Sequence, residues 1–195
     1  MVQFSGGIGS WAAAMRVAAQ HGTDNLVLLA ADTKAEDPDL WRFVDDAAAL
    51  LGVQPVIVAD GRTPWQVFAD QRFLGNSRIA PCSTFLKQRP CRAWLTTHAD
   101  PADTILYVGI DRSEQHRTPG ITRGWAPWTV KFPMCEPPFL TKTDMLDWAR
   151  TEGLHPPRAY AEGLSHNFSP QFGGVSIPST ERTSPRRLNW LIGLR

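Results

Sequence analysis

The chain has 195 residues and is 43% hydrophobic, which is enough to bury one substantial core. Its 20 lysines and arginines nearly balance its 19 aspartates and glutamates, so no global charge favours nucleic acid or an anionic membrane. No apolar stretch is long enough for a signal peptide or a membrane span, and we expect a cytoplasmic protein without a membrane partner. Its three widely spaced cysteines predict reduced thiols rather than a disulfide framework or a zinc knuckle.

Strands and helices are predicted to alternate along most of the chain. Short apolar runs predict strands, and apolar residues at helical spacing between capping residues and glycines predict helices. In chain order the predicted elements are a strand over 2–4, a helix over 11–19, a strand over 25–31, a helix over 38–51, a strand over 53–59, a helix over 63–68, a helix over 83–97, a strand over 104–110, a strand over 129–132 and a helix over 141–152.

This alternation predicts an α/β fold with three layers, in which a mostly parallel, five-stranded twisted sheet carries helices on both faces. Ligands of such sheets bind at the carboxyl ends of the strands. Residues 1–164 are expected to form this domain. Residues 165–195, rich in Ser, Pro, Gly and Arg, are expected to form an irregular tail, which Trp190, Leu191, Ile192 and Leu194 would allow to dock on the domain or to contact a partner.

A glycine-rich loop joins the first predicted strand to the first helix, with the sequence Ser5-Gly6-Gly7-Ile8-Gly9-Ser10. Backbone N–H groups at a helix N-terminus bind phosphate, and glycines let an anion approach them closely. No lysine follows as in a Walker loop. Two other interpretations stay open at this point. The loop is a plain connecting turn, or it is a dinucleotide site in which G-x-G-x-x-A leads to Asp32 as the ribose-binding acid of an NAD protein.

Four stretches, taken in order, resemble the PP-loop ATP pyrophosphatases, in particular the branch that contains the PAPS reductases. They are the S-G-G-x-x-S loop at 5–10, Asp32-Thr33 with Glu36 and Asp37, the cysteine-to-lysine segment from Pro81 and Cys82 to Lys87, and the G-x-x-R-x-E-x-x-R segment from Gly109 through Arg112 and Glu114 to Arg117. The stretch from Pro133 to Tyr160 and Gly163 also follows the family, so the resemblance spans about residues 2–167.

The resemblance implies an adenine nucleotide alpha-hydrolase-like fold and a nucleotide attacked or cleaved at its α-phosphate. ATP with Mg²⁺ is the implied ligand, and the loop residues Ser5, Gly6, Gly7, Ile8, Gly9 and Ser10 would hold the leaving pyrophosphate. Lys87, Arg112 and Arg117 would neutralise charge that develops there, and Gly109 belongs to the same site. Asp32 and Thr33 would face the ribose or the metal, and Cys82 is the thiol best placed for function.

Each of these side chains also has a plainer interpretation. Asp32 fits a strand-end turn, Lys87 an exposed helix lysine, and the arginines a solvated salt-bridged loop. Cys82 fits a buried, inert thiol, and Cys91 and Cys135 are interpreted as packing residues. The tryptophans are interpreted as core residues. One stretch of the chain is locally basic and has two interpretations. It binds tRNA, DNA or a phosphorylated substrate, or it is a solvated helix face. Its residues are Arg72, Arg78, Lys87, Arg89 and Arg92.

The chain departs from the family at its C-terminal end. A PAPS reductase needs a redox cysteine near its C-terminus, and relatives with an iron–sulfur cluster need several close cysteines, but no cysteine follows Cys135. No iron–sulfur cluster is expected.

The favoured function is activation of an unidentified acceptor, a small molecule or nucleic acid, for sulfur or nitrogen transfer. A PAPS or APS reductase-like enzyme, an NAD-dependent oxidoreductase and a catalytically silent nucleotide-binding protein remain alternatives, and a homo-oligomer is possible.

Overall fold

Five parallel strands form a single sheet in the part of the chain that the computed structural model describes, residues 1–73 and 81–163. The strand order is β3-β2-β1-β4-β5, and every neighbouring pair is parallel. The strands are β1 (Val2–Gln3), β2 (Leu28–Asp32), β3 (Pro55–Ala59), β4 (Ile105–Val108) and β5 (Thr129–Lys131). This confirms the predicted α/β class. The predicted tail over 165–195 lies outside the described residues.

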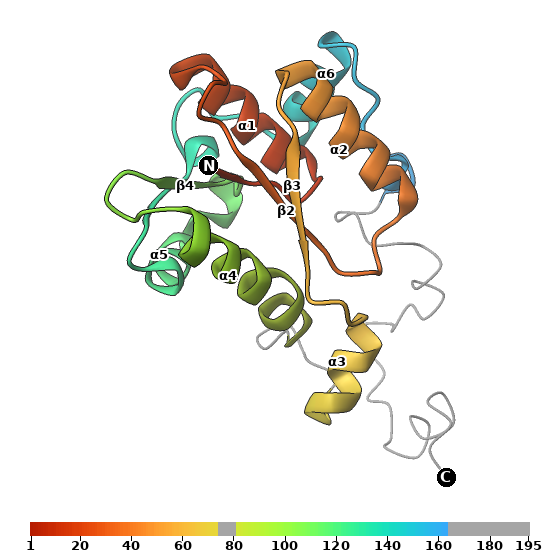
Figure 1. Cartoon of the computed structure of the whole chain (residues 1–195). Coiled ribbons are helices and arrows are strands. Elements are labelled where there is room, and N and C mark those ends of the chain that lie inside the picture. Colours follow the sequence, from red (N-terminus) through yellow and green to blue (C-terminus); the bar gives the residue numbers. More distant parts are fainter. Residues whose placement is uncertain (74–80, 164–195) are drawn as a thin grey trace.

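Helices cover both faces of the sheet (Figure 1). Helices α1 (Ile8–His21), α2 (Pro38–Leu51) and α6 (Lys142–Thr151) pack on one face, and α4 (Arg89–His98) and α5 (Thr118–Trp125) pack on the other. The short helix α3 (Pro64–Gln71) follows the edge strand β3 and lies beyond its carboxyl end.

Two hydrophobic cores result from the alternation of side chains along each strand. Leu28 and Tyr107 point to the core under α1, α2 and α6, whereas their neighbours Leu29 and Leu106 point to the core under α4 and α5. Successive residues of a strand face opposite sides of the sheet, so a strand covered on both faces reads as a continuous apolar run. The apolar run predicted as the second strand has this pattern.

Several helix ends lie where the capping residues predicted them. Pro38 opens α2 behind the capping side chain of Asp37, and Gly52 ends it in the left-handed conformation with φ 67°. Thr63 and Thr141 form capping boxes at the starts of α3 and α6. Hydrogen bonds between residues close in the sequence are therefore enough to set these helix boundaries.

Helix α5 and the 3₁₀ helix before it (Arg112–Arg117) were not predicted. Their sequence holds the signals of two helix starts, because Asp111 caps the first and Pro119 stands in the first turn of the second. Gly120 and Gly124 weaken the helical pattern between them, since glycine disfavours a helix. Together these two elements form one wall of the site described below.

The predicted helix over 83–97 contains a wide π-helical turn, Ser83–Gln88, directly before α4. There the Arg89 N–H donates to the Thr84 carbonyl, five residues back. A proline inside an α-helix lacks an N–H and clashes with the carbonyl four residues earlier, so the wider turn gives Pro90 room to continue the helix. Lys87 is carried on this turn.

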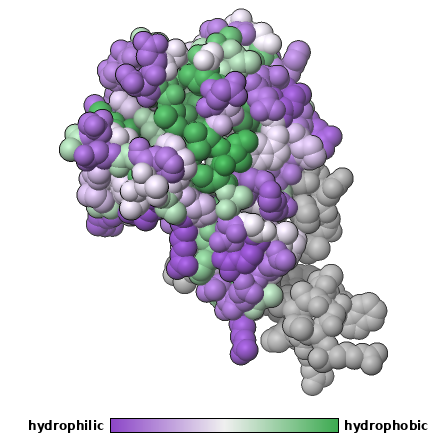
Figure 2. Space-filling view, viewed as in Figure 1, coloured by the Kyte–Doolittle hydropathy of each residue, from purple (hydrophilic) through white to green (hydrophobic). Residues whose placement is uncertain are grey.

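The face shown in Figure 2 has an apolar patch at its centre, over the edge strand β3. Ile57 of β3 is 50% exposed, and Leu50 of α2 is exposed as well. Polar side chains surround the patch (Figure 2).

Among the described residues, no helix is both long and apolar enough to span a bilayer.

Candidate functional site

The carboxyl ends of β1 and β4 lie side by side at the centre of the sheet, where the strand order reverses. The chain leaves these two strands toward helices on opposite faces, which opens a crevice between the two loops. A cleft of about 570 Å³ lies there. Its walls come from the loop after β1, the π-helical turn, the segment after β4, α5, and three residues more distant in the sequence, Lys142, Met145 and Tyr160.

The sequence predicted a loop over residues 5–10, but its last three residues form the first turn of α1, and close backbone packing shapes the whole segment. Gly6 has φ +71°, and a Cβ there would lie 2.7 Å from the Leu40 side chain. A Cβ on Gly9 would lie 2.6 Å from the Gly109 carbonyl oxygen, and one on Gly109 would lie 2.5 Å from the Gly9 oxygen. The N-terminus of α1 therefore sits directly against the end of β4, and only a chain without side chains at both positions allows this approach.

The two serines of the loop have different positions. Ser10 is buried, donates its hydroxyl hydrogen to the Gly7 carbonyl at 2.8 Å and accepts from the Ser5 N–H at 3.2 Å. Ser5 is exposed, and its hydroxyl donates to the Ser10 oxygen at 3.3 Å. Ser10 thus holds the loop in shape from within, whereas Ser5 presents its side chain at the surface of the cleft.

Tyr160 belongs to the site, although the sequence predicted no role for it. Its hydroxyl accepts a hydrogen bond from the Ile8 N–H at 3.0 Å, across 152 residues of sequence. The helix geometry leaves the next N–H groups of α1, those of Gly9 and Ser10, without intrahelical acceptors, and all three lie at the positive end of the helix. The Tyr160 hydroxyl thus takes up one of these three N–H groups, that of Ile8.

Charged contacts with α2 position Tyr160. Arg158 donates to the buried Asp37 carboxylate at 2.7 Å, and its own N–H donates to Asp39 at 2.7 Å. Arg42 bonds both Asp39 and the His155 carbonyl. The short 3₁₀ helix Arg158–Tyr160 is thereby fixed beside the start of α1.

Lys87 lines the cleft and is linked to the end of β2. Its Nζ lies 3.4 Å from Glu36 Oε1, and the other oxygen of Glu36 accepts from the Thr33 N–H and hydroxyl. Asp32 pairs with Lys34. Neither Asp32 nor Thr33 is among the residues that line the cleft. The predicted acid-threonine strand end therefore reaches the cleft only indirectly, because Thr33 bonds Glu36 and Glu36 pairs with Lys87.

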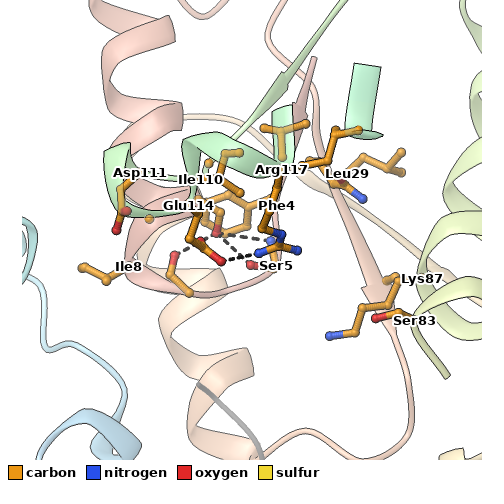
Figure 3. A pocket seen from close by; sticks show the side chains of 18 of the residues that line it. Phe4, Ser5, Ile8, Leu29, Ser83, Lys87, Ile110, Asp111, Glu114 and Arg117 are labelled. Carbon is orange, nitrogen blue, oxygen red and sulfur yellow. Dashed lines mark hydrogen bonds and ion pairs between the residues drawn. The ribbon is translucent and has the colours of Figure 1, made fainter. Parts of the chain in front are cut away.

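Arg112 and Arg117 were both predicted to belong to the site, but only Arg117 lines the cleft. Arg117 lines the cleft and pairs with Glu114, and Figure 3 shows both over the loop that carries Ser5, with Lys87 and Ser83 opposite. Arg112 instead lies with its guanidinium 4.2 Å from the centre of the Phe139 ring and does not line the cleft. Asp111 lines the cleft, and one of its oxygens caps the 3₁₀ helix.

The cysteines differ in their relation to the cleft. Cys91 is buried in the core under α4 and α5, as expected of a packing residue, and also reaches the wall of the cleft, whereas Cys82 is half-buried and does not line the cleft. Cys91 is 1% exposed, and burial raises the pKa of its thiol to about 12. Burial, with nearby Asp111 contributing, also raises the pKa of Cys135. At neutral pH Cys91 and Cys135 are therefore protonated and poor nucleophiles.

Within residues 1–73 and 81–163, no group of three or more His, Cys, Asp or Glu side chains is arranged to hold a metal ion. Comparison of the chain with protein-family models and with curated protein sequences gave no match.

Proposed function

We propose that this protein is a PP-loop enzyme that binds ATP and activates an acceptor by attack at the α-phosphate, with release of pyrophosphate. The observation that carries the proposal is the position of the 5–10 loop at the switch point of the sheet, facing Lys87 and Arg117 across one cleft. A helix N-terminus and two cations around a single space match the needs of a polyphosphate.

The size and charge of the cleft support a nucleotide ligand. Its volume of about 570 Å³ falls inside the roughly 300–1,000 Å³ typical of small-molecule sites. Its lining includes Lys87, Arg117 and Lys142 as cations, and Leu29, Ile110 and Ile121 offer apolar contact. A ligand that carries both phosphates and an apolar base can contact cationic and apolar side chains in this cleft.

In the proposed reaction an oxygen of the acceptor attacks the α-phosphorus of ATP. The new P–O bond forms while the bond from the α-phosphorus to the bridging oxygen breaks, and pyrophosphate leaves with that electron pair. The N–H groups of Gly9 and Ser10 at the start of α1 and the Ser5 side chain would bind the pyrophosphate, and Lys87 and Arg117 would offset the charge that develops on it. Glu36 and Glu114 keep these two cations in place.

Mg²⁺ commonly enters such sites with the phosphates and takes only one or two carboxylates from the protein. Asp111, whose second oxygen is not used for capping, is the carboxylate of the cleft that fits this role. The ion would supply charge neutralisation at the phosphates.

Two observations favour ATP over the alternatives. Asp32, the acid that an NAD site would use, pairs with Lys34 away from the cleft. The thiol that does line the cleft, Cys91, has a pKa raised to about 12 and is poorly suited to attack sulfur in a sulfonucleotide. Both support the adenylating reaction.

Calorimetric titration with ATP, PAPS and NAD, each with Mg²⁺, tests the proposal. We expect ATP to bind the wild type, and Lys87→Gln and Arg117→Gln each to weaken binding by about tenfold, since each removes a charged hydrogen-bond donor to phosphate. Lys131→Gln removes the same charge from an exposed position on β5 and should leave the affinity unchanged.

Other results would redirect or reject the assignment. Binding of NAD alone, or ATP binding insensitive to both cleft substitutions, would contradict the proposed site. Preference for PAPS would favour the sulfonucleotide reductase. ATP binding without pyrophosphate release in the presence of candidate acceptors would favour the catalytically silent alternative.

A further inference from the structure

A second hollow, of about 360 Å³, lies between the π-helical turn, α4 and α5. We infer that this hollow, the α4–α5 groove, binds a phosphate group of the acceptor, carried by a nucleotide that is free or part of a single strand. That the ligand is the acceptor rests on the proposed function. That the groove binds a phosphate-bearing molecule does not, because it follows from the groove's own residues.

The α4–α5 groove is continuous with the nucleotide cleft. Gln88, Ile121 and Trp125 line both hollows. A molecule bound in the groove would therefore have one end beside the cleft, where the proposed attack takes place. The volume lies at the lower end of the roughly 300–1,000 Å³ of small-molecule sites, which suits one nucleotide unit rather than a large body.

The charge of the groove is positive. Arg89 and Arg92 line it, and no carboxylate is among its lining residues. Arg92 bonds the carbonyls of Gly124 and Ala126, so it is held in a fixed position and still has N–H donors to spare. Arg89 is exposed, and within the described residues it forms no ion pair; its guanidinium lies 4.0 Å from the centre of the Phe85 ring.

The guanidinium groups are thus oriented by aromatic rings and carbonyls rather than neutralised by acids. Arg92 also lies over Trp125, 5.3 Å from the ring centre. Asp60 is the acid whose charge interacts with Arg89, but its main partner is Arg62. Planar guanidinium groups fixed in this way offer two-point contacts to phosphate oxygens.

The opposite wall of the groove is open because of two glycines on α5. Gly120 and Gly124 are four residues apart on one helix face, and a Cβ built on either meets no atom within 4 Å. Neither position has positive φ, so neither backbone conformation nor packing requires glycine there. Glycine weakens a helix by about 1 kcal/mol relative to alanine, so the pair costs stability while it keeps the groove wide.

The test measures binding of uridine 5′-monophosphate and of an eight-nucleotide thymidine strand, with α,β-methylene ATP present to fill the cleft without being cleaved. Gly124→Leu places a side chain in the groove, and Arg89→Gln removes its exposed charge. Each should weaken binding by about tenfold. Arg123→Gln removes a charge from the neighbouring exposed position of α5, outside both hollows, and should change binding little.

Tighter binding of the monophosphate identifies a free nucleotide as the source of the phosphate, and tighter binding of the strand identifies nucleic acid. The inference is overturned if neither probe binds, if Gly124→Leu and Arg89→Gln bind as the wild type does, or if Arg123→Gln weakens binding equally. Lys87→Gln separates this result from the proposed function, because it affects the ATP analogue in the cleft and leaves the groove intact.

Discussion

At the scale of single residues, the candidate site depends on positions where a side chain is absent. The contact between Gly9 and Gly109 brings the start of α1 onto the end of β4, and it does so through backbone atoms that have little freedom to shift. The loop after β1 is thus held by backbone packing as well as by its hydrogen bonds. Ser10, buried under the loop, adds hydrogen bonds that keep the same shape.

Gly9→Ala should destabilise the protein by on the order of 1–3 kcal/mol, because its Cβ would lie 2.6 Å from the Gly109 oxygen and force the backbone apart. Urea denaturation measures the change. Gly120→Ala is the matched control: with no atom within 4 Å, it should be neutral or stabilise α5 by up to about 1 kcal/mol. Equal midpoints for Gly9→Ala and the wild type would show that the loop can move away from β4.

At the scale of elements, the starts of several helices are set by capping hydrogen bonds between neighbouring residues. In α6 the Thr141 hydroxyl accepts from the Asp144 N–H at 3.2 Å, and the Asp144 carboxylate accepts from the Thr141 N–H at 2.7 Å. Helix α6 packs on α1, where Trp148 meets Trp11 edge to face with ring centres 4.9 Å apart. The start of α6 is therefore stabilised by a local cap, and its apolar face is buried by packing against α1.

Thr141→Ala should lower the free energy of unfolding by about 1 kcal/mol, since it removes the acceptor for an N–H at the helix start. Thr141→Ser keeps the hydroxyl and should retain most of the stability. Chemical denaturation of the three proteins, followed by far-UV circular dichroism, makes the comparison. If Ala and Ser behaved alike, the capping bond would contribute nothing and the loss would reflect the missing methyl group.

At the scale of the whole molecule, charged contacts join the last described segment to α2. Asp39 is central to them, because it accepts from Arg42 at 2.6 Å and from the Arg158 N–H at 2.7 Å. These hydrogen bonds, that of Arg42 first, lower the pKa of Asp39 below its usual value. Through Arg158 the contacts also place Tyr160 on the Ile8 N–H.

Stability should therefore fall in acid. The folded protein binds the Asp39 proton less tightly than the unfolded chain, so the contribution of Asp39 is complete above about pH 4 and is lost as the pH drops through the lowered pKa. Urea denaturation from pH 7 to pH 3 measures this loss. Asp39→Asn should be less stable at pH 7 and lose less below pH 4, whereas Asp24→Asn, at an exposed carboxylate, should follow the wild-type profile.

The sequence by itself determined the alternation of strands and helices, most helix starts, and the position of the glycine-rich loop. Each of these depends on neighbouring residues: apolar runs, capping side chains, and glycine or proline at a turn. Helix α5 escaped prediction because its local signals conflict, with a proline favouring a helix start and two glycines opposing the helix that follows.

Only the tertiary structure decided which side chains share the site. Arg117 lines the cleft and Arg112 does not, and Cys91 rather than Cys82 is on the cleft wall. Thr33 does not line the cleft but bonds Glu36, which pairs with Lys87. The tertiary structure also brought Tyr160 to Ile8 across 152 residues. Such contacts follow from strand order and from which face each helix covers, and these depend on long-range packing that no local pattern of residues encodes.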